Sequence, residues 1–322
     1  MYVVTGSTGH LGANLIDALV AMGKPVRALV RGTAPAYLQR EGVEIATADV
    51  LDISSLRRAF VDAEVVFHLA AMISIRGDYG GKVTATNVDG AHHVATCALE
   101  AGVRRLVHFS SCHAYDLEDG VTLDETGPRP SKHHTVYDQS KAAGEERVRE
   151  VIAQGLDAVI LNPTGVIGPL DYKPSRMGQT LLDLRDGRLP GSVAGGFDWV
   201  DARDVVAGAL AAEEKGLRGE NYILGGHWLS VKDLMQLAAD ACGGRAPWFA
   251  SPIWLAKMAA PFATAYATML KREPVFTGEA IRALAAPARP ILDRAKTQLG
   301  YQPRPMEETL ADTYAFFKGE GM

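Results

Sequence analysis

Three glycines near the start of the chain constrain its fold more than any other feature. The apolar, β-branched run at residues 2–5 stops at Gly6, and glycines recur at Gly9 and Gly12. From Leu11 onward the apolar residues follow a helical period, so the segment is typical of a strand, a tight turn and a helix. Glycines in such a turn let a pyrophosphate approach the backbone, and the helix N-terminus offers it free N–H groups. The pattern predicts a dinucleotide-binding unit, with an ordinary strand-to-helix turn as the alternative.

The composition fits a globular enzyme. The chain has 322 residues, of which 47% are hydrophobic and 22% charged, so it can bury a sizeable core. Its net charge of -5 argues against a nucleic-acid partner. Cys97, Cys112 and Cys242 show neither metal-ligand spacing nor a disulfide framework, which indicates a reducing, cytoplasmic compartment. Because the chain runs directly into a core strand, we expect no cleavable signal peptide.

One apolar segment, residues 250–270, is long enough to span a bilayer. Lys257 and Pro261 interrupt it, and its alanines lower its hydrophobicity. We therefore expect buried or lid-forming helices here rather than a membrane span.

The second predicted strand, residues 25–31, ends at Arg31 and is followed by Gly32. In a dinucleotide-binding unit the tip of this strand faces the adenosine ribose. Enzymes that use NAD commonly place an acid there, which would repel a 2′-phosphate, whereas a guanidinium holds one by charge-assisted hydrogen bonds. Arg31 therefore predicts NADP as the cofactor. If Arg31 is only a solvated surface residue, NAD is the alternative.

Four further strands are predicted, at residues 43–48, 64–69, 105–110 and 157–162. The second of them is an almost continuous apolar run, which is typical of a strand covered on both faces. Asp49 and Val50 follow the first, where a side chain suits the adenine edge. Ala70 and Ala71 follow the second and leave room for a ribose.

The last two of these strands lead to the predicted chemistry. Ser111 follows strand 105–110, and the Pro- and Gly-rich stretch 163–169 is expected to form a rigid irregular loop beside the nicotinamide. Tyr137 and Lys141 open a predicted helix four residues apart, so both side chains lie on one face. A phenol with a pKa near about 10 is a poor catalyst at neutral pH, and a neighbouring ammonium stabilises its phenolate. The order of these motifs favours an acid–base site.

With these motifs the chain resembles an extended short-chain dehydrogenase/reductase of the NAD-dependent epimerase/dehydratase superfamily. The matching segments are Thr5-Gly-x-x-Gly-x-x-Gly12, Asp49-Val50, His68-Leu-Ala-Ala71, Asn87-Val-Asp-Gly90, Phe109-Ser-Ser111, Tyr137-x-x-x-Lys141, Asn162-Pro-Thr-Gly-Val-Ile-Gly-Pro169, Val200-Asp-Ala-Arg-Asp204 and Leu299-Gly-Tyr301. Within the superfamily, Val26-Arg-Ala-Leu-Val-Arg31 and the Asn-Pro-Thr loop are most similar to dihydroflavonol-4-reductases and 3β-hydroxysteroid dehydrogenases.

The resemblance implies roles for particular residues. Tyr137 is the expected acid or base, Lys141 lowers its pKa and binds the nicotinamide ribose, and Ser111 holds the substrate oxygen. Ser111 is favoured over Ser110 because Tyr115 then matches the tyrosine that usually follows four residues later. Asn87 is a weaker assignment, as a brace rather than a proton relay. The implied cofactor-binding set is Gly6, Thr8, Gly9, His10, Leu11, Gly12, Arg31, Asp49, Val50, Leu69, Ala70, Ala71, Asn87, Tyr137, Lys141, Pro163 and Val166.

The resemblance also implies an α/β fold, a Rossmann-type doubly wound parallel sheet with a smaller, mostly helical C-terminal substrate-binding part. We expect residues 1–165 to form the dinucleotide-binding domain, to which segments near 197–224 return. Residues 166–322 are expected mainly to bind substrate. The local pattern predicts a short strand at 221–224 and an amphipathic helix at 306–317.

Three functions compete. The first is an NADP-dependent oxidoreductase that interconverts a ketone or aldehyde and an alcohol; the second is a nucleotide-sugar epimerase that retains NAD. The third, a dinucleotide sensor without catalysis, has no use for a tuned tyrosine. A sugar-nucleotide dehydratase is disfavoured because Cys112 and His113 stand where that reaction usually needs an Asp-Glu pair.

An epimerase would need cations for a diphosphate, whereas the apolar 250–270 segment suits a lipophilic or aromatic substrate. The available cations are Lys173, Arg176, Lys271, Arg272 and Arg282. His92-His93 and His133-His134 lack the spacing of metal ligands, so we expect no metal site. His133 and His134 precede Tyr137 and are expected in a surface loop, with substrate contact as the alternative. The expected partner is a small carbonyl or alcohol, and the expected state is a monomer or homodimer.

Overall fold

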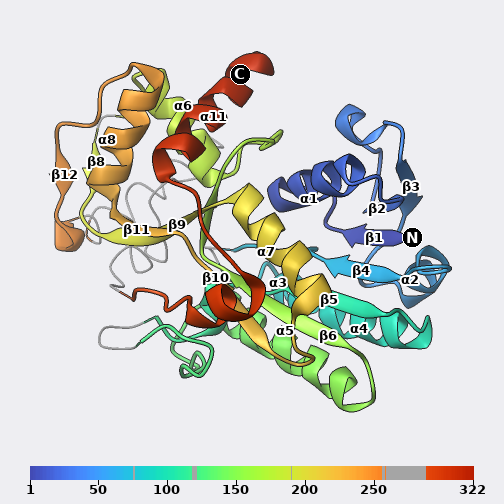
Figure 1. Cartoon of the computed structure of the whole chain (residues 1–322). Helices are drawn as coiled ribbons and strands as arrows, with labels where there is room; N and C mark the ends of the chain where they lie inside the picture. Colours follow the sequence, from blue (N-terminus) through green and yellow to red (C-terminus); the bar gives the residue numbers. More distant parts are fainter. Residues whose placement is uncertain (75–76, 118–121, 190, 256–257, 259–287) are drawn as a thin grey trace.

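The computed structural model describes residues 1–74, 77–117, 122–189, 191–255, 258 and 288–322 (Figure 1). Its centre is a seven-stranded parallel sheet with the strand order β10-β6-β5-β4-β1-β2-β3. The strands are β1 Tyr2–Thr5, β2 Val26–Val30, β3 Val43–Thr47, β4 Val65–His68, β5 Arg105–Phe109, β6 Ala158–Pro163 and β10 Asn221–Leu224. From β1 the sheet grows to β2 and β3 on one side and to β4, β5, β6 and β10 on the other, as in a Rossmann-type doubly wound sheet.

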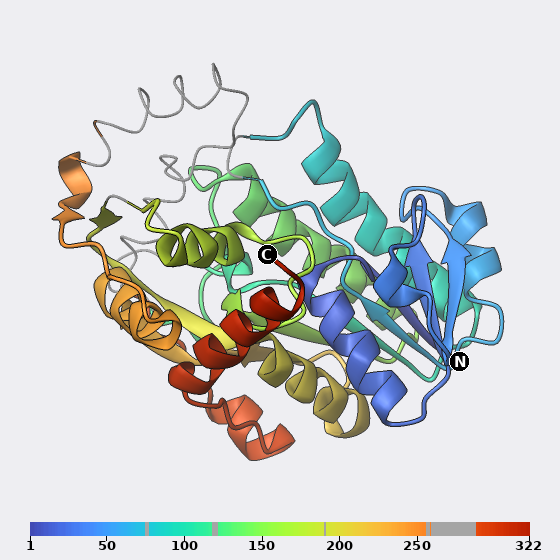
Figure 2. The same ribbon diagram turned by 90° about the horizontal axis from the view of Figure 1, so that it is seen from above.

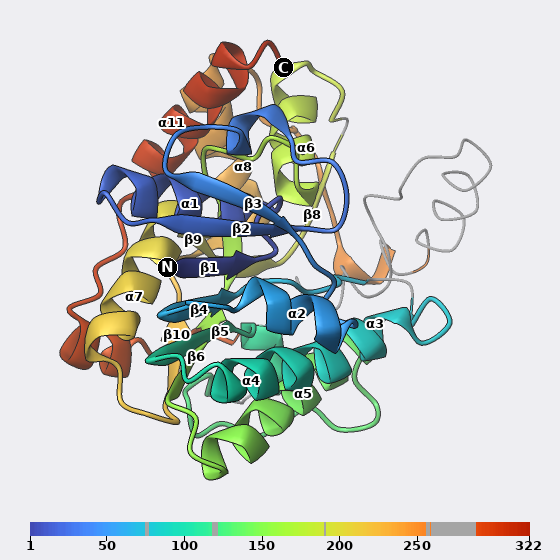
Figure 3. The ribbon, with the colours of Figure 1, turned by 90° about the vertical axis from the view of Figure 1, so that its right-hand side faces the viewer.

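Helices cover both faces of this sheet (Figure 3). On one face α1 and α7 pack against each other, and on the other face α4 packs against α2 and α5. The strands supply both cores by alternation, because neighbouring side chains point to opposite faces. Val4 and Phe67 join the core with α1 and α7, whereas Val3 and Val66 join the core on the other face. The helices of this part are α1 His10–Ala21, α2 Ile53–Ala59, α3 Lys82–Thr84, α4 Gly90–Glu100, α5 Val136–Ala153 and α7 Ala202–Lys215.

The C-terminal part gathers to one side of the main sheet (Figure 2). It contains the helices α6 Arg176–Arg185, α8 Val231–Cys242 and α11 Met306–Gly319, which share one core with β7, β9 and β11. This part has two small sheets. The first consists of β7 Gly165–Ile167, β9 Gly196–Asp201 and β11 His227–Ser230. The second consists of β8 Ser192–Val193 and β12 Ala250–Ser251. Single turns connect the elements at η1 Ala36–Leu38, η2 Ala85–Asp89, η3 Cys112–Ala114 and η4 Ala295–Leu299.

Most predicted elements are present, with ends that differ by a residue or two. The exception is the stretch 163–169, which was expected to be irregular throughout. Its central residues form β7, which pairs in parallel with β9 over thirty residues later. Such a strand depends on a distant partner, and the prolines and glycines around it give no local alternation that would predict it.

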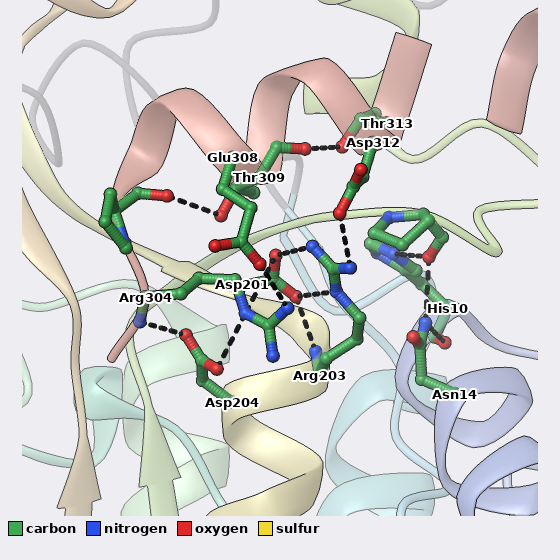
Figure 4. Close-up of polar contacts among 12 residues, drawn as sticks. His10, Asn14, Asp201, Arg203, Asp204, Arg304, Glu308, Thr309, Asp312 and Thr313 are labelled. Carbon is green, nitrogen blue, oxygen red and sulfur yellow. Dashed lines mark hydrogen bonds and ion pairs between the residues drawn. The ribbon is translucent and has the colours of Figure 1, made fainter. Parts of the chain in front are cut away.

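An ionic network fastens the last helix to the rest of the molecule (Figure 4). The fully buried carboxylate of Asp201 lies 2.7 Å from Arg203, whose guanidinium also reaches Asp312 of α11 at 2.6 Å. Arg304 pairs with Asp204 at 2.9 Å and with Glu308 at 3.0 Å. The Asp-Ala-Arg-Asp segment of the sequence therefore joins α7 and β9 to α11.

Residues 250–255 and 258 are the described part of the apolar segment, and its remaining residues, which include Lys257 and Pro261, lie outside the described ranges. Trp254 and Met258 are exposed, so these two positions are not buried, and the expectation of buried or lid-forming helices otherwise falls on residues outside the described ranges. Among the described residues, no helix combines the length and apolarity needed to cross a membrane.

Two buried histidines in the sheet predict acid sensitivity. Burial lowers the pKa of His68 to about 3 and that of His108 well below its usual value. Both are therefore neutral in the folded protein, whereas the unfolded chain binds protons near pH 6.5. Stability is then lost as the pH falls below about 6.5, by about 2 kcal/mol at pH 5 for His68 and in the same direction for His108.

We expect the loss of unfolding free energy between pH 7 and pH 5 to be smaller in His108→Leu than in the parent protein. Urea unfolding at both pH values measures this difference, with the exposed His133→Gln as the control. An equal loss in His108→Leu and the parent would show that His108 is protonated in the folded state.

Candidate active site

The glycines of the turn after β1 answer two needs: close packing of the backbone within the protein, and open space beside the turn. Gly6 has a φ of +67°, and a Cβ added there would lie 2.7 Å from the backbone nitrogen of Ala70. A Cβ on Gly12 would clash with the carbonyl oxygen of Gly6. Gly9 is exposed, and its added Cβ would meet only the same oxygen, at 3.3 Å. Packing within the protein thus explains two of the glycines, whereas the open space at Gly9 fits a ligand that approaches the backbone.

The helix that follows presents an uncapped N-terminus. Its N-cap is Gly9, and no side chain caps it, so the N–H groups of its first turn remain available to an anion. His10 and Asn14 each donate a hydrogen bond of 2.9 Å to the carbonyl oxygen of Pro169 (Figure 4). These two contacts hold the end of the stretch 163–169 against the glycine turn. The residues fit a bound pyrophosphate.

The other predicted cofactor residues lie around the same edge of the sheet. The Thr5 hydroxyl accepts the N–H groups of Leu69 and Ala70, at 3.1 Å each, and so ties the ends of β1 and β4 together. Ala71 is exposed beyond them. Thr8, Leu11 and Val166 are partly buried, and Pro163 is buried as the last residue of β6.

The end of β2 carries an exposed guanidinium without a partner among the described residues. Arg31 is exposed, and no described residue makes an ion pair or hydrogen bond with its side chain. A Cβ on Gly32 would have nothing within 4 Å. Asp49 uses one carboxylate oxygen to accept the N–H of Leu51 at 3.0 Å, and Val50 is buried beside it. Arg31 therefore has room for an anionic partner.

Ser111, Tyr137 and Lys141 meet at this sheet edge. In the sheet, Thr5 of β1 pairs with His68 of β4, and His68 pairs with His108 of β5. The C-terminal ends of β1 and β5 therefore lie at the same edge of the sheet. Ser111 stands two residues after β5, and α5 begins at Val136 with a capping box at Thr135.

Burial shifts the pKa values of Tyr137 and Lys141. Burial raises the pKa of Tyr137, and a hydrogen bond with Ser111 opposes this rise. The buried Lys141 donates to the carbonyl oxygen of Phe109 at 3.0 Å, and burial lowers its pKa to about 8. Tyr137 and Lys141 lie one turn apart on α5, so a protonated phenol and a buried amine of lowered pKa share one face of this helix.

The predicted site residues did not include a buried acid that lies near Lys141. Glu145 follows one turn later in α5, is completely buried, and opposes the fall in the Lys141 pKa. Its carboxylate accepts from Asn162 at 2.7 Å and from Asn221 at 3.0 Å, and pairs with Arg129 at 2.8 Å. Asn162 also donates to the carbonyl oxygen of Ser111 at 2.9 Å. One network therefore holds both Lys141 and the backbone of Ser111.

Asn87 has its amide fully engaged. Its side chain accepts from the backbone nitrogen of Met72 at 2.7 Å and donates to the carbonyl oxygen of Met72 at 3.0 Å. It also donates to the Ser140 hydroxyl at 2.9 Å. A Cβ on Gly144 would clash with the Asn87 carbonyl, so the small residue lets α5 approach η2. These contacts brace the loop after β4 against α5.

The remaining candidates from the sequence are a second serine, two histidines and a set of cations. Ser110 is buried with no hydrogen-bond partner for its hydroxyl among the described residues. His133 is exposed, and His134 lies 3.1 Å from Asp116. The described part of the chain contains no group of three His, Cys, Asp or Glu side chains that could hold a metal. Lys173 and Arg176 are exposed, whereas the other predicted cations lie outside the described residues: Lys271, Arg272 and Arg282.

A small cavity of about 10 Å³, room for about one water molecule, lies beside Cys112. Most of its lining is apolar, and Thr164 and Asp198 add a polar corner. Its apolar lining residues are Cys112, Leu117, Leu123, Phe197 and Ala288.

Known proteins resemble this chain along most of its length. The model of the NAD dependent epimerase/dehydratase family matches residues 2–225. Sterol demethylase protein B of Methylococcus capsulatus is 36% identical over 99% of this chain and 99% of its own. A ketoreductase of Stigmatella aurantiaca, named for 4-hydroxy-2-methyl-3-oxo-4-farnesyl-3,4-dihydroquinoline-1-oxide, is 30% identical over 80% of this chain and 78% of its own.

The crystal structure of gox2253 superposes with a TM-score of 0.86 at 32% identity, covering 100% of this chain and 98% of the other. Relatives named for dihydroflavonol 4-reductase and 3-beta-hydroxysteroid dehydrogenase also match, which confirms the predicted resemblance. The chain belongs to the NAD dependent epimerase/dehydratase family, the extended short-chain dehydrogenases/reductases.

Proposed function

We propose that this protein is an NADP-preferring reductase that interconverts a ketone or aldehyde and an alcohol. The observation that carries the proposal is the meeting of Ser111, Tyr137 and Lys141 at the sheet edge that also bears the glycine turn. Residues 1–165 would bind the dinucleotide, and residues 166–322 would mainly bind the substrate.

Each of the three side chains has a chemical role in this proposal. A nicotinamide dinucleotide held at the glycine turn supplies the hydride. The Ser111 and Tyr137 hydroxyls donate to the substrate carbonyl oxygen, and the oxygen takes the Tyr137 proton as the carbon is reduced. The Lys141 ammonium offsets the charge of the resulting phenolate. Burial supports the acid role, because it keeps the phenol protonated before reaction.

The names of the relatives favour reduction over epimerisation of a nucleotide sugar. Relatives matched along most of the chain are named as reductases or dehydrogenases, including one named for a 3-oxo-4-hydroxy compound.

The cofactor that accompanies the purified protein tests this choice. We expect an NADP that exchanges during dialysis, with alcohol formed in proportion to the NADPH added. An epimerase would instead keep one tightly bound NAD through dialysis and consume no added NADPH, and this result would overturn the proposal.

Cofactor preference depends on Arg31. Charge-assisted bonds from its guanidinium to a 2′-phosphate are worth roughly 1.5–3 kcal/mol, so NADPH should be preferred over NADH by about ten- to a hundredfold in kcat/KM. Arg31→Ala should lose this preference, and Arg31→Asp should reverse it by adding repulsion. Steady-state kinetics with both cofactors measure the change. An equal loss with NADH and NADPH would show instead that Arg31 stacks on the adenine.

A further inference from the structure

A pair of stacked tyrosine rings joins the loop after β2 to the segment after β7. Tyr37 lies in the loop 31–42, between β2 and β3, and Tyr172 follows the stretch 163–169. The two rings are parallel within 3°, and their centroids are 3.9 Å apart. Burial raises the pKa of both phenols, so the stacked rings are uncharged at neutral pH. Two segments that are distant in the sequence therefore meet face to face.

Tyr37 fixes the loop 31–42 to the glycine turn. Its hydroxyl donates a hydrogen bond of 3.2 Å to the carbonyl oxygen of Thr8, next to the N-cap of α1. Leu38, the next residue, is buried in the core that includes residues of α1. The loop begins at the exposed Arg31, and only residues 32–36 separate this guanidinium from the Tyr37 ring. The position of the ring therefore bears on the position of Arg31.

Tyr172 belongs to a segment that is held from two sides. Its ring meets Phe316 of α11 edge-on, with centroids 5.1 Å apart and an interplanar angle of 89°. The carbonyl oxygen of Pro169 accepts hydrogen bonds from the start of α1, and the buried carboxylate of Asp171 accepts the N–H of the N-cap residue of α6 at 2.7 Å. Between these contacts Leu170 has a φ of +61°, which a leucine rarely adopts. The contacts on both sides maintain this conformation and present the Tyr172 ring to Tyr37.

We propose that Tyr172 is a positioning residue for the cofactor, which holds the loop of Arg31 through its stack on Tyr37 and so favours a dinucleotide with a 2′-phosphate. This inference rests on the proposed function and adds a residue of the C-terminal part to the recognition of the adenosine half. Tyr172 needs no contact with the dinucleotide for this role. A loop that is already ordered loses less conformational entropy when its arginine binds a phosphate, so the stack increases affinity.

Tyr172→Ala removes one ring of the stack and tests the assignment by binding alone. Fluorescence titrations with NADPH and with NADH give the two dissociation constants without any turnover. The constant for NADPH should rise by about three- to tenfold, the worth of one stacked aromatic pair. The constant for NADH should stay nearly unchanged, because NADH carries no 2′-phosphate for Arg31 to hold. Tyr172→Leu, which keeps apolar bulk against Phe316, should change the two constants in the same way.

Tyr172→Phe is the matched control, since it keeps the ring and both of its aromatic contacts. It should leave both dissociation constants at the parent values. A second comparison places Tyr172→Ala in the background of Arg31→Ala. If the stack acts through Arg31, the additional substitution should no longer alter the ratio of the two constants.

Three results would overturn the assignment of Tyr172 while leaving the preference for NADP intact. These are unchanged binding in Tyr172→Ala and Tyr172→Leu, an equal loss of affinity for NADPH and NADH, or a loss for NADPH that persists in full in the background of Arg31→Ala. Equal affinities of the parent protein for NADPH and NADH would instead contradict the cofactor preference of the proposed function, and this inference with it.

Discussion

Replacement of Tyr137 by phenylalanine should reduce turnover by a factor on the order of 10²–10⁴, with dinucleotide affinity little changed. The phenol is the proposed proton donor, and burial raises its pKa, so the hydroxyl is present in its protonated form before reaction. Phenylalanine keeps the ring that packs edge-on against His113. The variant therefore removes the proton donor and keeps the aromatic ring with its packing.

Tyr115→Phe is the matched control. Tyr115 is also buried near Ser111, and its hydroxyl has no hydrogen-bond partner among the described residues. Its loss should leave turnover close to that of the parent. Steady-state rates and a fluorescence titration with NADPH on both variants separate chemistry from binding. If Tyr137→Phe kept nearly full turnover, the tyrosine would not be the acid.

Gly9→Val should abolish dinucleotide binding while the protein remains folded. Gly9 is exposed, and a Cβ there would meet only the Gly6 carbonyl oxygen, at 3.3 Å. The branched side chain therefore projects into the space where a pyrophosphate would approach the uncapped end of α1. We expect a native circular dichroism spectrum and at least a hundredfold weaker binding of NADPH.

Gly12→Ala provides the contrast, because its Cβ would clash with the backbone at Gly6. That variant should lose thermal stability, whereas Gly9→Val should not. Unimpaired NADPH binding by a folded Gly9→Val protein would mean that the turn is only a connection between strand and helix.

The sequence sufficed for features that depend on near neighbours along the chain. The glycine turn and the four-residue spacing of Tyr137 and Lys141 are local patterns, and α1 and α5 begin where those patterns place them. The strand at 221–224 and the helix that begins at Met306 were likewise predicted from their own residues.

Features that depend on distant partners were not predictable in this way. The strand β7 forms because it pairs with β9. The residues of β7 alone show no pattern that predicts this pairing. Glu145 has the spacing of a third residue on the face of Tyr137 and Lys141, which is a weak signal. Its role became visible only when Asn162 and Asn221 were found on its carboxylate. His113 and Asp138 meet across 25 positions of sequence.

The central claim is that a ketone takes its hydride from a freely exchanging NADPH at this site. The most direct measurement uses NADPH that carries deuterium at the transferred position of the nicotinamide, with mass spectrometry of the alcohol formed from a ketone substrate. The account predicts one deuterium on the carbinol carbon of every product molecule and an equal amount of oxidised NADP. Product without deuterium, or deuterium that never leaves the added cofactor while a bound NAD cycles, would contradict it.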